Sequence, residues 1–326
     1  MASEMRAVQY TEFSDDVTKC VIVKVPVPQP EEGEVLVKVS RAAANPIDWK
    51  VMGGHLQGAG WKCPLPFTMG YDLAGTVEAL GGGANFAVGD RVFAVQWGAG
   101  SHGDTRIGGT FADYVVVPAS RLSRIPEGVS DEAAAASALV GTTAFQALDA
   151  AGVKSGSRVL ILGGSSAVGL VAVQLAKLRG ATVITTCSTR TIEFVKSLGA
   201  DEIINYRETK WDEKLVEAKV DVVFDTVGEE AAFKRADAVV KEGGSFITIA
   251  SFDAGFAPDG HQPRFGFASF FCLTNDAAVQ DKLAAFIKNG KLKIPIEKSF
   301  AFDEVHEMLA CQKGGKSIGK NVLVVH

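Results

Sequence analysis

The chain has 326 residues, of which 47% are hydrophobic and 22% charged, and its net charge is −5. This composition is typical of an ordinary soluble protein, argues against a disordered chain and leaves room for two domains of usual size. The lack of a dense Lys/Arg cluster argues against nucleic acid as the main partner, and no run approaches the roughly 18 apolar residues of a membrane span.

The first third of the chain predicts a β-rich domain. Short runs of β-type residues alternate with Pro and Gly, and they lie at 21–25, 35–39, 75–79, 91–94 and 114–117. Such spacing is typical of a compact antiparallel or barrel-like unit.

Beyond Pro126 the pattern changes to alternating strands and helices. Ser130, with Glu132 after it, precedes an Ala-rich stretch and predicts a capped helix start. The expected strands lie at 158–162, 182–187, 202–206, 220–226 and 245–250, and the expected helices at 168–179 and 191–198. This alternation predicts a parallel sheet covered by helices.

The final segment predicts a helix at 276–288 and a closing strand at 321–325. We therefore expect an α/β protein in three segments. Residues 1–125 form the β-rich domain, residues 126–274 an inserted α/β domain, and residues 275–326 return to the first domain.

A glycine-rich turn follows the apolar strand at 158–162. Its sequence is GGSSAVG at 163–169, and a helix follows at once. Glycine lets the backbone approach a pyrophosphate, and the helix N-terminus offers free N–H groups. In the G-x-G-x-x-G register the middle glycine is replaced by Ser166, whose hydroxyl we expect to donate to a phosphate oxygen. The candidate contacts are Gly164, Ser165, Ser166, Ala167 and Val168; the alternative is a tight strand–helix connection.

The end of the next strand favours NADPH over NADH. A carboxylate there would accept from the ribose 2′-OH of NAD, whereas hydroxyls and a guanidinium suit a 2′-phosphate. The chain carries Ser188 and Arg190, and the first acid is Glu193. The alternative is that Arg190 is a solvated residue at a helix start.

Several segments together resemble the medium-chain dehydrogenase/reductase superfamily, in its zinc-free quinone oxidoreductase branch. They are ANPID at 44–48, GYDLAG at 70–75, VGDRV at 88–92, GTFADY at 109–114, GTTA at 141–144, LGAD at 198–201, FDTVG at 224–228 and GKNVL at 319–323. The resemblance implies a GroES-like substrate domain, a Rossmann doubly wound cofactor domain and a cleft between them.

The resemblance also predicts that the chain holds no metal. Zinc-dependent members carry Cys, His and Cys where this chain has Asn45, Tyr71 and Leu139, which are poor zinc ligands. The five cysteines are scattered without a Cys-x-x-Cys pair, so neither a zinc cluster nor a disulfide framework is expected. Without a Lewis acid, alcohol oxidation is disfavoured.

Hydride transfer without a metal needs an acceptor that is already electrophilic, such as a quinone or an alkene conjugated to a carbonyl. By resemblance, Asn45 lies near the nicotinamide and could donate to the acceptor oxygen; the alternative is a turn residue before Pro46. Tyr71 is a second candidate donor, although a packed aromatic is the more favoured interpretation. No acid–base pair is specified, and solvent can supply the final proton.

The resemblance implies further cofactor contacts along the chain. Thr143 lies beside the nicotinamide and phosphates in similar proteins, and Tyr206 matches a tyrosine near the 2′-phosphate. The other implied contacts are Lys50, Lys320 and Asn321, and the backbones of Val227 and Ala250 are expected contacts because these residues end sheet strands at the cofactor crevice. For Tyr206, strand-end packing is the alternative, and for Lys50, a solvated side chain.

Two glycine-rich loops and one apolar run bear on the substrate and on assembly. The loops at 51–67 and 96–109 carry Trp61 and Trp97 and suit the mouth of an apolar pocket, or else are ordinary connections. The run at 265–273 resembles the strand by which relatives form dimers, so a homodimer is expected; a buried strand is the alternative.

The leading hypothesis is therefore an NADPH:quinone reductase. The rivals are a reductase of α,β-unsaturated ketones, aldehydes or thioesters, a non-catalytic NADPH-binding protein with a crystallin-like or scaffold role, and a zinc alcohol dehydrogenase. Because the N-terminus lacks a signal-peptide core, we expect a cytoplasmic protein and leave an organelle open.

Overall fold

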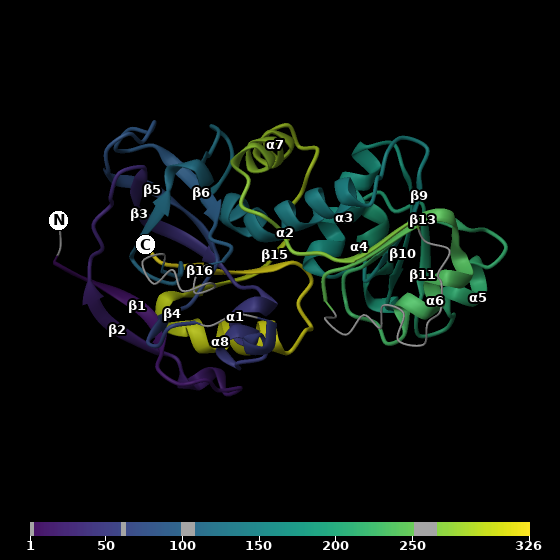
Figure 1. Cartoon of the computed structure of the whole chain (residues 1–326), viewed down its shortest axis with the longest axis horizontal. Coiled ribbons are helices and arrows are strands. Elements are labelled where there is room, and N and C mark those ends of the chain that lie inside the picture. Colours follow the sequence, from purple (N-terminus) through teal and green to yellow (C-terminus); the bar gives the residue numbers. More distant parts are fainter. Residues whose placement is uncertain (1–2, 60–62, 99–107, 251–265) are drawn as a thin grey trace. The chain divides into compact units, whose positions relative to one another are not determined.

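A computed structural model describes residues 3–59, 63–98, 108–250 and 266–326 (Figure 1). The chain forms two compact units. The first comprises Met1–Thr142, Thr274–Gly290 and Ile294–His326, and the second comprises Thr143–Leu273 and Lys291–Lys293. The units divide within helix α2 (Asp131–Ala150) rather than at residue 125, because this 20-residue helix is continuous and begins in the first unit.

The first unit is built on two sheets. The smaller has the order β2-β1-β4, from strands β1 (Glu4–Tyr10), β2 (Val21–Pro26) and β4 (Phe67–Thr68). The larger has the order β15-β16-β3-β5-β6-β8, with β7 also paired to β3. Its strands are β3 (Glu34–Ala43), β5 (Asp72–Leu80), β6 (Arg91–Val95), β7 (Tyr114–Pro118), β8 (Ser123–Arg124), β15 (Ile296–Ala301) and β16 (Lys320–Val324).

Strand register places the last residue of β3 beside the first residue of β5 and the middle of β16. Ala43, the last residue of β3, is paired with Asp72, the first of β5, and with Val322 of β16. The helices of this unit besides α2 are α1 (Pro46–Met52), α7 (Ala277–Lys288) and α8 (Val305–Lys313). Pro46 suits the start of α1 because the first helical N–H needs no partner.

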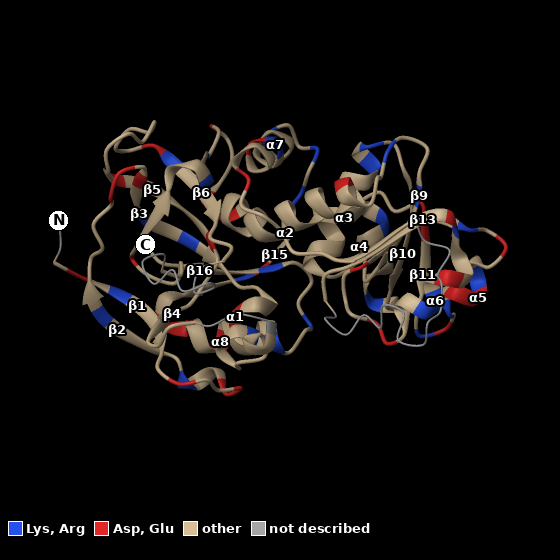
Figure 2. Ribbon diagram, viewed as in Figure 1, with Lys and Arg blue, Asp and Glu red and all other residues tan. Residues whose placement is uncertain are grey.

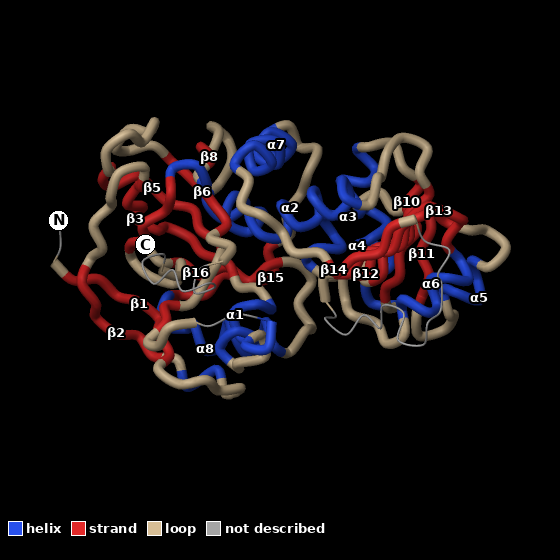
Figure 3. Tube along the Cα trace, viewed as in Figure 1, coloured by secondary structure: helices blue, strands red, loops and turns tan. Residues whose placement is uncertain are grey.

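The second unit is a parallel sheet of the order β11-β10-β9-β12-β13-β14, which Figure 3 shows in red. The order reverses between β9 and β12, and this reversal is where doubly wound folds bind dinucleotides. The strands are β9 (Arg158–Leu162), β10 (Thr182–Cys187), β11 (Glu202–Asn205), β12 (Val220–Asp225), β13 (Val240–Thr248) and β14 (Phe267–Phe270). The helices are α3 (Ala167–Leu178), α4 (Ile192–Ser197), α5 (Trp211–Leu215) and α6 (Ala232–Val239).

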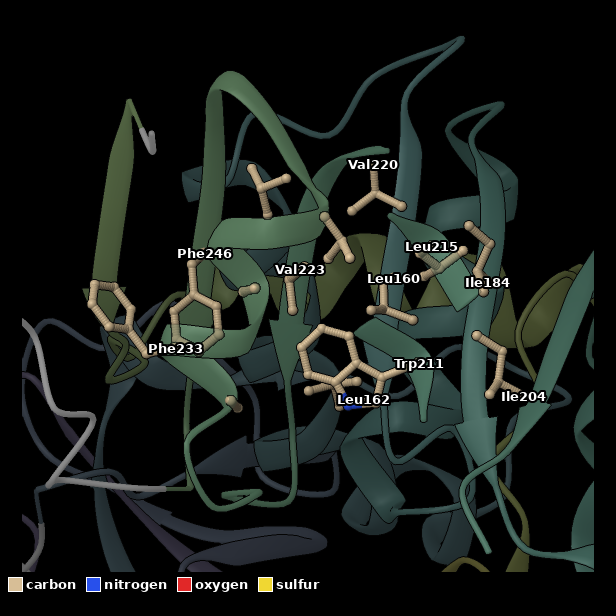
Figure 4. Packing of buried hydrophobic residues seen from close by; sticks show 14 residues of the cluster. Leu160, Leu162, Ile184, Ile204, Trp211, Leu215, Val220, Val223, Phe233 and Phe246 are labelled. Atoms are coloured by element: carbon tan, nitrogen blue, oxygen red, sulfur yellow. The ribbon is translucent and has the colours of Figure 1, made fainter. Parts of the chain in front are cut away.

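The core of the second unit lies under this sheet. Trp211 packs among the apolar side chains of the strands, including Leu162 and Val223 (Figure 4). Opposite charges adjoin at α5 and α6 (Figure 2), where the Arg235 guanidinium pairs with Asp212 and lies 4.4 Å from the centre of the Trp211 ring. The short helices α5 and α6 are thereby tied to one another and to the sheet.

The expected α/β class is confirmed, and so are the strands of the parallel sheet, with 158–162 and 182–187 at their observed bounds. Ser130 caps α2 through its hydroxyl, which accepts from the backbone N–H of Ala133 at 3.2 Å. The apolar run at 265–273 contains strand β14, although residue 265 and parts of the two glycine-rich loops, Trp61 among them, lie outside the described residues. No helix in the described part of the chain is long and apolar enough to cross a bilayer.

Candidate functional site

The turn between β9 and α3 is shaped by glycines that cannot be replaced without collision. Gly163 has φ +81°, and a Cβ there would lie 2.2 Å from Val227 Cγ1. A Cβ on Gly169 would lie 2.1 Å from the carbonyl oxygen of Gly163. Helix α3 therefore starts in direct contact with the strand end, which is the close approach that a dinucleotide turn requires.

Backbone N–H groups at the start of α3 are available for a phosphate. The amides of Ser165, Ala167 and Val168 have no acceptor in the described part of the chain. The amide of Gly164 donates to Thr186 O and that of Ser166 to Gly163 O, so these two predicted contacts are used within the protein. Three free amides at the positive end of a 12-residue helix fit a pyrophosphate.

The hydroxyl of Ser166 makes two contacts within the protein. It accepts from the N–H of Gly169 at 2.9 Å and so caps α3. It also lies 2.8 Å from the hydroxyl of Thr226, which donates its own proton to Leu162 O at 2.7 Å. Since Thr226 gives its proton to Leu162 O, Ser166 is the donor to Thr226, and a bond from Ser166 to a phosphate oxygen stays a prediction that requires this contact to break.

The ends of β10 and β11 bring together the side chains expected at a 2′-phosphate. Tyr206 N donates to Cys187 O, and the Tyr206 side chain is 53% exposed. Arg190 lies in the short 3₁₀ turn Thr189–Thr191 after β10, next to Ser188. The guanidinium of Arg207, which sequence reasoning missed, lies 5.8 Å from the centre of the Tyr206 ring.

The ends of β12 and β13 meet at the other side of the switch point. Val227 follows β12 with half of its surface exposed, and Ala250 follows β13. Gly228 approaches Ala250 so closely that a Cβ would lie 3.3 Å from its carbonyl oxygen. The buried carboxylate of Asp225, also missed by sequence reasoning, holds this turn.

In the first unit, a buried cluster forms where β3 ends and where β5 and β16 begin. The Lys320 ammonium donates to Ala44 O at 2.8 Å, to Asn45 Oδ1 at 2.5 Å and to Asp72 Oδ2 at 3.0 Å. Asp72 Oδ1 also accepts from the backbone N–H of Leu139 at 2.7 Å. Lys320 thus uses all three of its hydrogens inside the protein, and its ammonium is not directed to a ligand.

Asn45 is held in the same cluster. Its side-chain amide donates to Asp72 Oδ2 at 2.8 Å and to Ala43 O at 3.2 Å, and the residue is 1% exposed. Both amide hydrogens have internal acceptors, so the expected donation to a substrate oxygen would require one of these bonds to break. The geometry assigns Asn45 an orienting role at the start of α1.

Two acidic groups in this cluster share one cation. Asp48 accepts from the Asn45 backbone N–H at 2.6 Å, while its other oxygen has no partner among the described residues. Burial raises the pKa of Asp48 to about 8. Burial also raises the pKa of Asp72, but the contacts of Asp72 with Lys320, Asn45 and Leu139 act in the opposite direction. Asp72 accepts from three donors, one of which is the ammonium, so its charged form is stabilised. Asp48 has only one donor, so of the two carboxyl groups it is Asp48 that holds a proton at neutral pH.

The remaining predicted residues are placed as follows. Tyr71 is buried, its ring centre lies 6.1 Å from that of Trp97, and burial raises its pKa well above the usual range. Lys50 is half-buried beside Trp49, and burial lowers its pKa. Thr143 is buried, and its hydroxyl has no partner in the described residues. Asn321 is fully buried and donates to Ser317 Oγ at 3.1 Å.

The residues at the positions of the zinc ligands do not fit a zinc ion. Asn45 and Leu139 both donate to Asp72, and Tyr71 precedes it in the chain. An amide, a phenol and an aliphatic side chain replace thiolates and imidazole, and the Lys320 ammonium supplies the local positive charge. In the described part of the chain, no three His, Cys, Asp or Glu side chains gather as a metal site would require.

Comparisons with known proteins agree with both units. Residues 31–127 match the family model described as alcohol dehydrogenase GroES-like domain, and residues 198–323 match the model described as zinc-binding dehydrogenase. The chain is 35% identical to 2-methylene-furan-3-one reductase from Solanum lycopersicum, over 98% of this chain and 79% of the relative. It is 32% identical to the NADPH-dependent alkenal/one oxidoreductase of Arabidopsis thaliana, with the same coverage.

Among solved structures, the quinone oxidoreductase from Coxiella burnetii superposes with a TM-score of 0.88 at 32% identity, over 99% of this chain and 100% of that chain. The two family matches, the doubly wound sheet and the relatives that match 98% of this chain agree with one another. The chain therefore belongs to the medium-chain dehydrogenase/reductase superfamily, in its quinone oxidoreductase-like branch.

Proposed function

We propose that this chain is an NADPH-dependent oxidoreductase that passes hydride to an electrophilic small molecule, with a quinone as the first acceptor class. The free amides at the start of α3 carry this proposal, because they are unsatisfied donors placed at the switch point of a doubly wound sheet. When bound, the cofactor supplies the hydride. The protein's own residues bind and orient it.

Cofactor choice rests on the charge at the ends of β10 and β11. Arg190 and Arg207 provide two guanidinium groups there, and Ser188 provides a hydroxyl. A guanidinium binds a phosphate with paired, charge-assisted hydrogen bonds. We therefore propose that NADPH is preferred over NADH.

We further propose that the reaction needs no zinc. The buried cluster around Asp72 is neutral at pH 7 when Asp48 is protonated, since one ammonium balances one carboxylate. It offers no thiolate or imidazole for zinc. An acceptor that is already electrophilic does not require a Lewis acid, which favours quinones and conjugated carbonyls over simple alcohols and aldehydes.

Alkenes conjugated to a carbonyl form the second candidate acceptor class. Two relatives that match 98% of this chain are named for a methylene-furanone and for alkenals and alkenones. Quinone names belong among others to chloroplast relatives that match 62% and 63% of this chain, to a Pongo abelii relative that matches 76% of it, and to the Coxiella structure that matches 99% of it. Both classes accept a hydride at carbon or oxygen and develop negative charge on an oxygen.

A turnover screen of purified protein tests the proposal. NADPH and NADH are each offered with a small quinone, an enone and an enal, and cofactor oxidation is followed at 340 nm. We expect turnover with NADPH for at least one acceptor class. Tight NADPH binding without turnover of any acceptor would make the chain a non-catalytic NADPH-binding protein, and zinc retained in stoichiometric amount would revive a zinc alcohol dehydrogenase.

The cofactor preference has its own matched variants. Arg190→Ala is expected to weaken NADPH binding by about tenfold, the value of one lost charge-assisted contact, and to leave NADH binding unchanged. Lys196→Ala removes one exposed positive charge from α4, further along the chain, and serves as the control. Equal NADPH affinity in the two variants would remove Arg190 from the site.

We also propose that the chain forms a homodimer through β14, because this strand lies at the edge of its sheet and is partly exposed. Within the described residues β14 pairs only with β13, and Phe267 is 39% exposed. A second copy could add its own β14 to this edge. Light scattering should give a dimer for the wild type and a monomer for Phe267→Lys, while Leu178→Lys, at an equally exposed apolar side chain, should leave the mass unchanged.

We propose a cytoplasmic location as well. All five cysteines are free thiols, as in proteins of reducing compartments. Some relatives are named chloroplastic, so cell fractionation must compare cytoplasm with organelles. Recovery in an organelle fraction would overturn the proposal.

A further inference from the structure

Asp225, the last residue of β12, is a buried carboxylate that the proposed function has not used. It is 1% exposed. Its Oδ1 accepts the backbone N–H groups of Val227 at 3.1 Å and Gly228 at 3.0 Å, with that of Glu229 at 3.5 Å. Its Oδ2 accepts from the hydroxyl of Thr248 at 3.1 Å, across the neighbouring strand β13.

The partners of Asp225 identify it as an ionised group. Backbone N–H groups can only donate, and a carboxylate that accepts several of them is stabilised in its charged form. Burial raises the pKa of Asp225, and these four donors oppose that effect. No Lys, Arg or His forms an ion pair with it in the described part of the chain. The charge is therefore solvated by dipoles and not neutralised by a cation.

The topology places this charge on the nicotinamide side. The pyrophosphate turn follows β9, and the 2′-position of the adenosine ribose is read at the end of β10, on one side of the switch point. The other half of the dinucleotide must then lie over β12 and β13, on the opposite side. Asp225 ends β12, and its turn carries Val227, whose apolar side chain is half exposed.

We propose that Asp225 is a positioning residue for the nicotinamide half, which fixes the turn at 226–229 and favours the oxidised cofactor through its negative charge. The inference rests on the proposed NADPH function. The nicotinamide ring carries a positive charge when oxidised and none when reduced, so a nearby buried carboxylate stabilises NADP⁺ more than NADPH. That difference favours departure of the hydride.

The same carboxylate also links the two turns of the crevice. Thr226, the next residue, joins the Ser166 hydroxyl to Leu162 O, and Ser166 caps α3. A shift of the 226–229 turn would therefore also displace Ser166 and the start of α3 at the pyrophosphate turn. Loss of the Asp225 side chain should thus disturb both halves, whereas loss of its charge alone should disturb only the balance between the oxidised and reduced cofactor.

The test compares Kd values for NADP⁺ and NADPH, measured by calorimetry on the full chain without any acceptor. In Asp225→Asn the amide oxygen can still accept from Val227 and Gly228, and the amide nitrogen can donate to Thr248, so shape is kept and charge is lost. Asp225→Ser is a second neutral variant, because a serine hydroxyl accepts the N–H two residues on. Asp221→Asn is the matched control, since it removes one negative charge from the other end of β12, beside Lys241.

We expect both neutral variants to weaken NADP⁺ relative to NADPH by about tenfold, because the variants lose the attraction between a buried carboxylate and the positive charge of the oxidised ring. The control should keep the wild-type ratio within about twofold. An unchanged ratio in a folded Asp225→Asn or Asp225→Ser chain overturns the inference and leaves the proposed function standing. Failure of the wild type to bind either nucleotide would instead remove the proposed function itself.

Discussion

Replacing Lys320 with methionine removes the ammonium of the buried cluster while keeping most of its volume. The side chain is 3% exposed and lies 3.0 Å from Asp72 Oδ2. In Lys320→Met the Asp72 carboxylate would retain the N–H groups of Asn45 and Leu139 but would have no counter-charge. Asn45 Oδ1 and Ala44 O would also lose their donor.

The magnitude follows from the geometry. A pair at 3.0 Å has an attraction of roughly 5 kcal/mol at an effective dielectric constant near 20, against which stands the cost of burying both charges. Breaking such a pair from one side costs about 3–5 kcal/mol, because the remaining charge is buried alone. We therefore expect Lys320→Met to lower the free energy of unfolding of the first unit by that amount at pH 7.

Urea unfolding followed by tryptophan fluorescence measures this loss, because three of the four tryptophans, Trp49, Trp61 and Trp97, lie within the first 142 residues. Lys19→Met, at an exposed lysine of the same unit, is the control and should change the free energy by no more than about 0.5 kcal/mol.

A double-mutant cycle isolates the pair. Asp72→Asn combined with Lys320→Met leaves no buried charge in the pair, so the double variant should lose less than the sum of the single losses, by about 2 kcal/mol or more. Strict additivity, or a loss below about 1 kcal/mol in Lys320→Met, would show that the ammonium is not the counter-charge described.

Three further substitutions probe the same two regions. Burial raises the pKa of Asp48 to about 8, so the native chain keeps a proton that the unfolded chain releases above about pH 4. From about pH 4 to pH 8 the free energy of unfolding of the wild type should therefore fall relative to that of Asp48→Asn, by up to about 1.4 kcal/mol per pH unit. The same pH dependence of this free energy in both proteins, measured by urea unfolding, would contradict the prediction. Ser166→Ala should lower the free energy of unfolding by about 1 kcal/mol, the value of an N-cap, and leave NADPH affinity nearly unchanged. A large affinity loss at constant Tm, measured by calorimetry, would instead show that the hydroxyl contacts a phosphate. Gly169→Ala should weaken NADPH binding at least about tenfold, since its Cβ would meet Gly163 O at 2.1 Å and displace α3, and retention of affinity in a binding titration would refute that close approach.

The dinucleotide turn was predictable because it is local. An apolar run, a glycine-rich turn and a helix follow one another within 21 residues, and the physical demands on that turn are met by neighbours in sequence. Side-chain periodicity also predicted the parallel strands, where burial on both faces leaves a continuous apolar run. By contrast, α5 and α6 were missed: they are short, and α5 rests on Trp211, which packs against strands far away in the chain.

What the sequence by itself determined is therefore the fold class, the order of its elements and the position of the pyrophosphate turn. The roles of particular polar side chains depended on the tertiary structure. Asn45 forms hydrogen bonds with Asp72, which lies 27 residues further along the chain, and with Lys320, which lies 275 residues further. Ser166 bonds to Thr226 across 60 residues. The pairing of strands that are distant in the chain brings such residues together. A buried N–H or O–H group then donates to whichever acceptor lies within hydrogen-bond distance. Only the folded chain decided that these donors face inward and not toward a ligand.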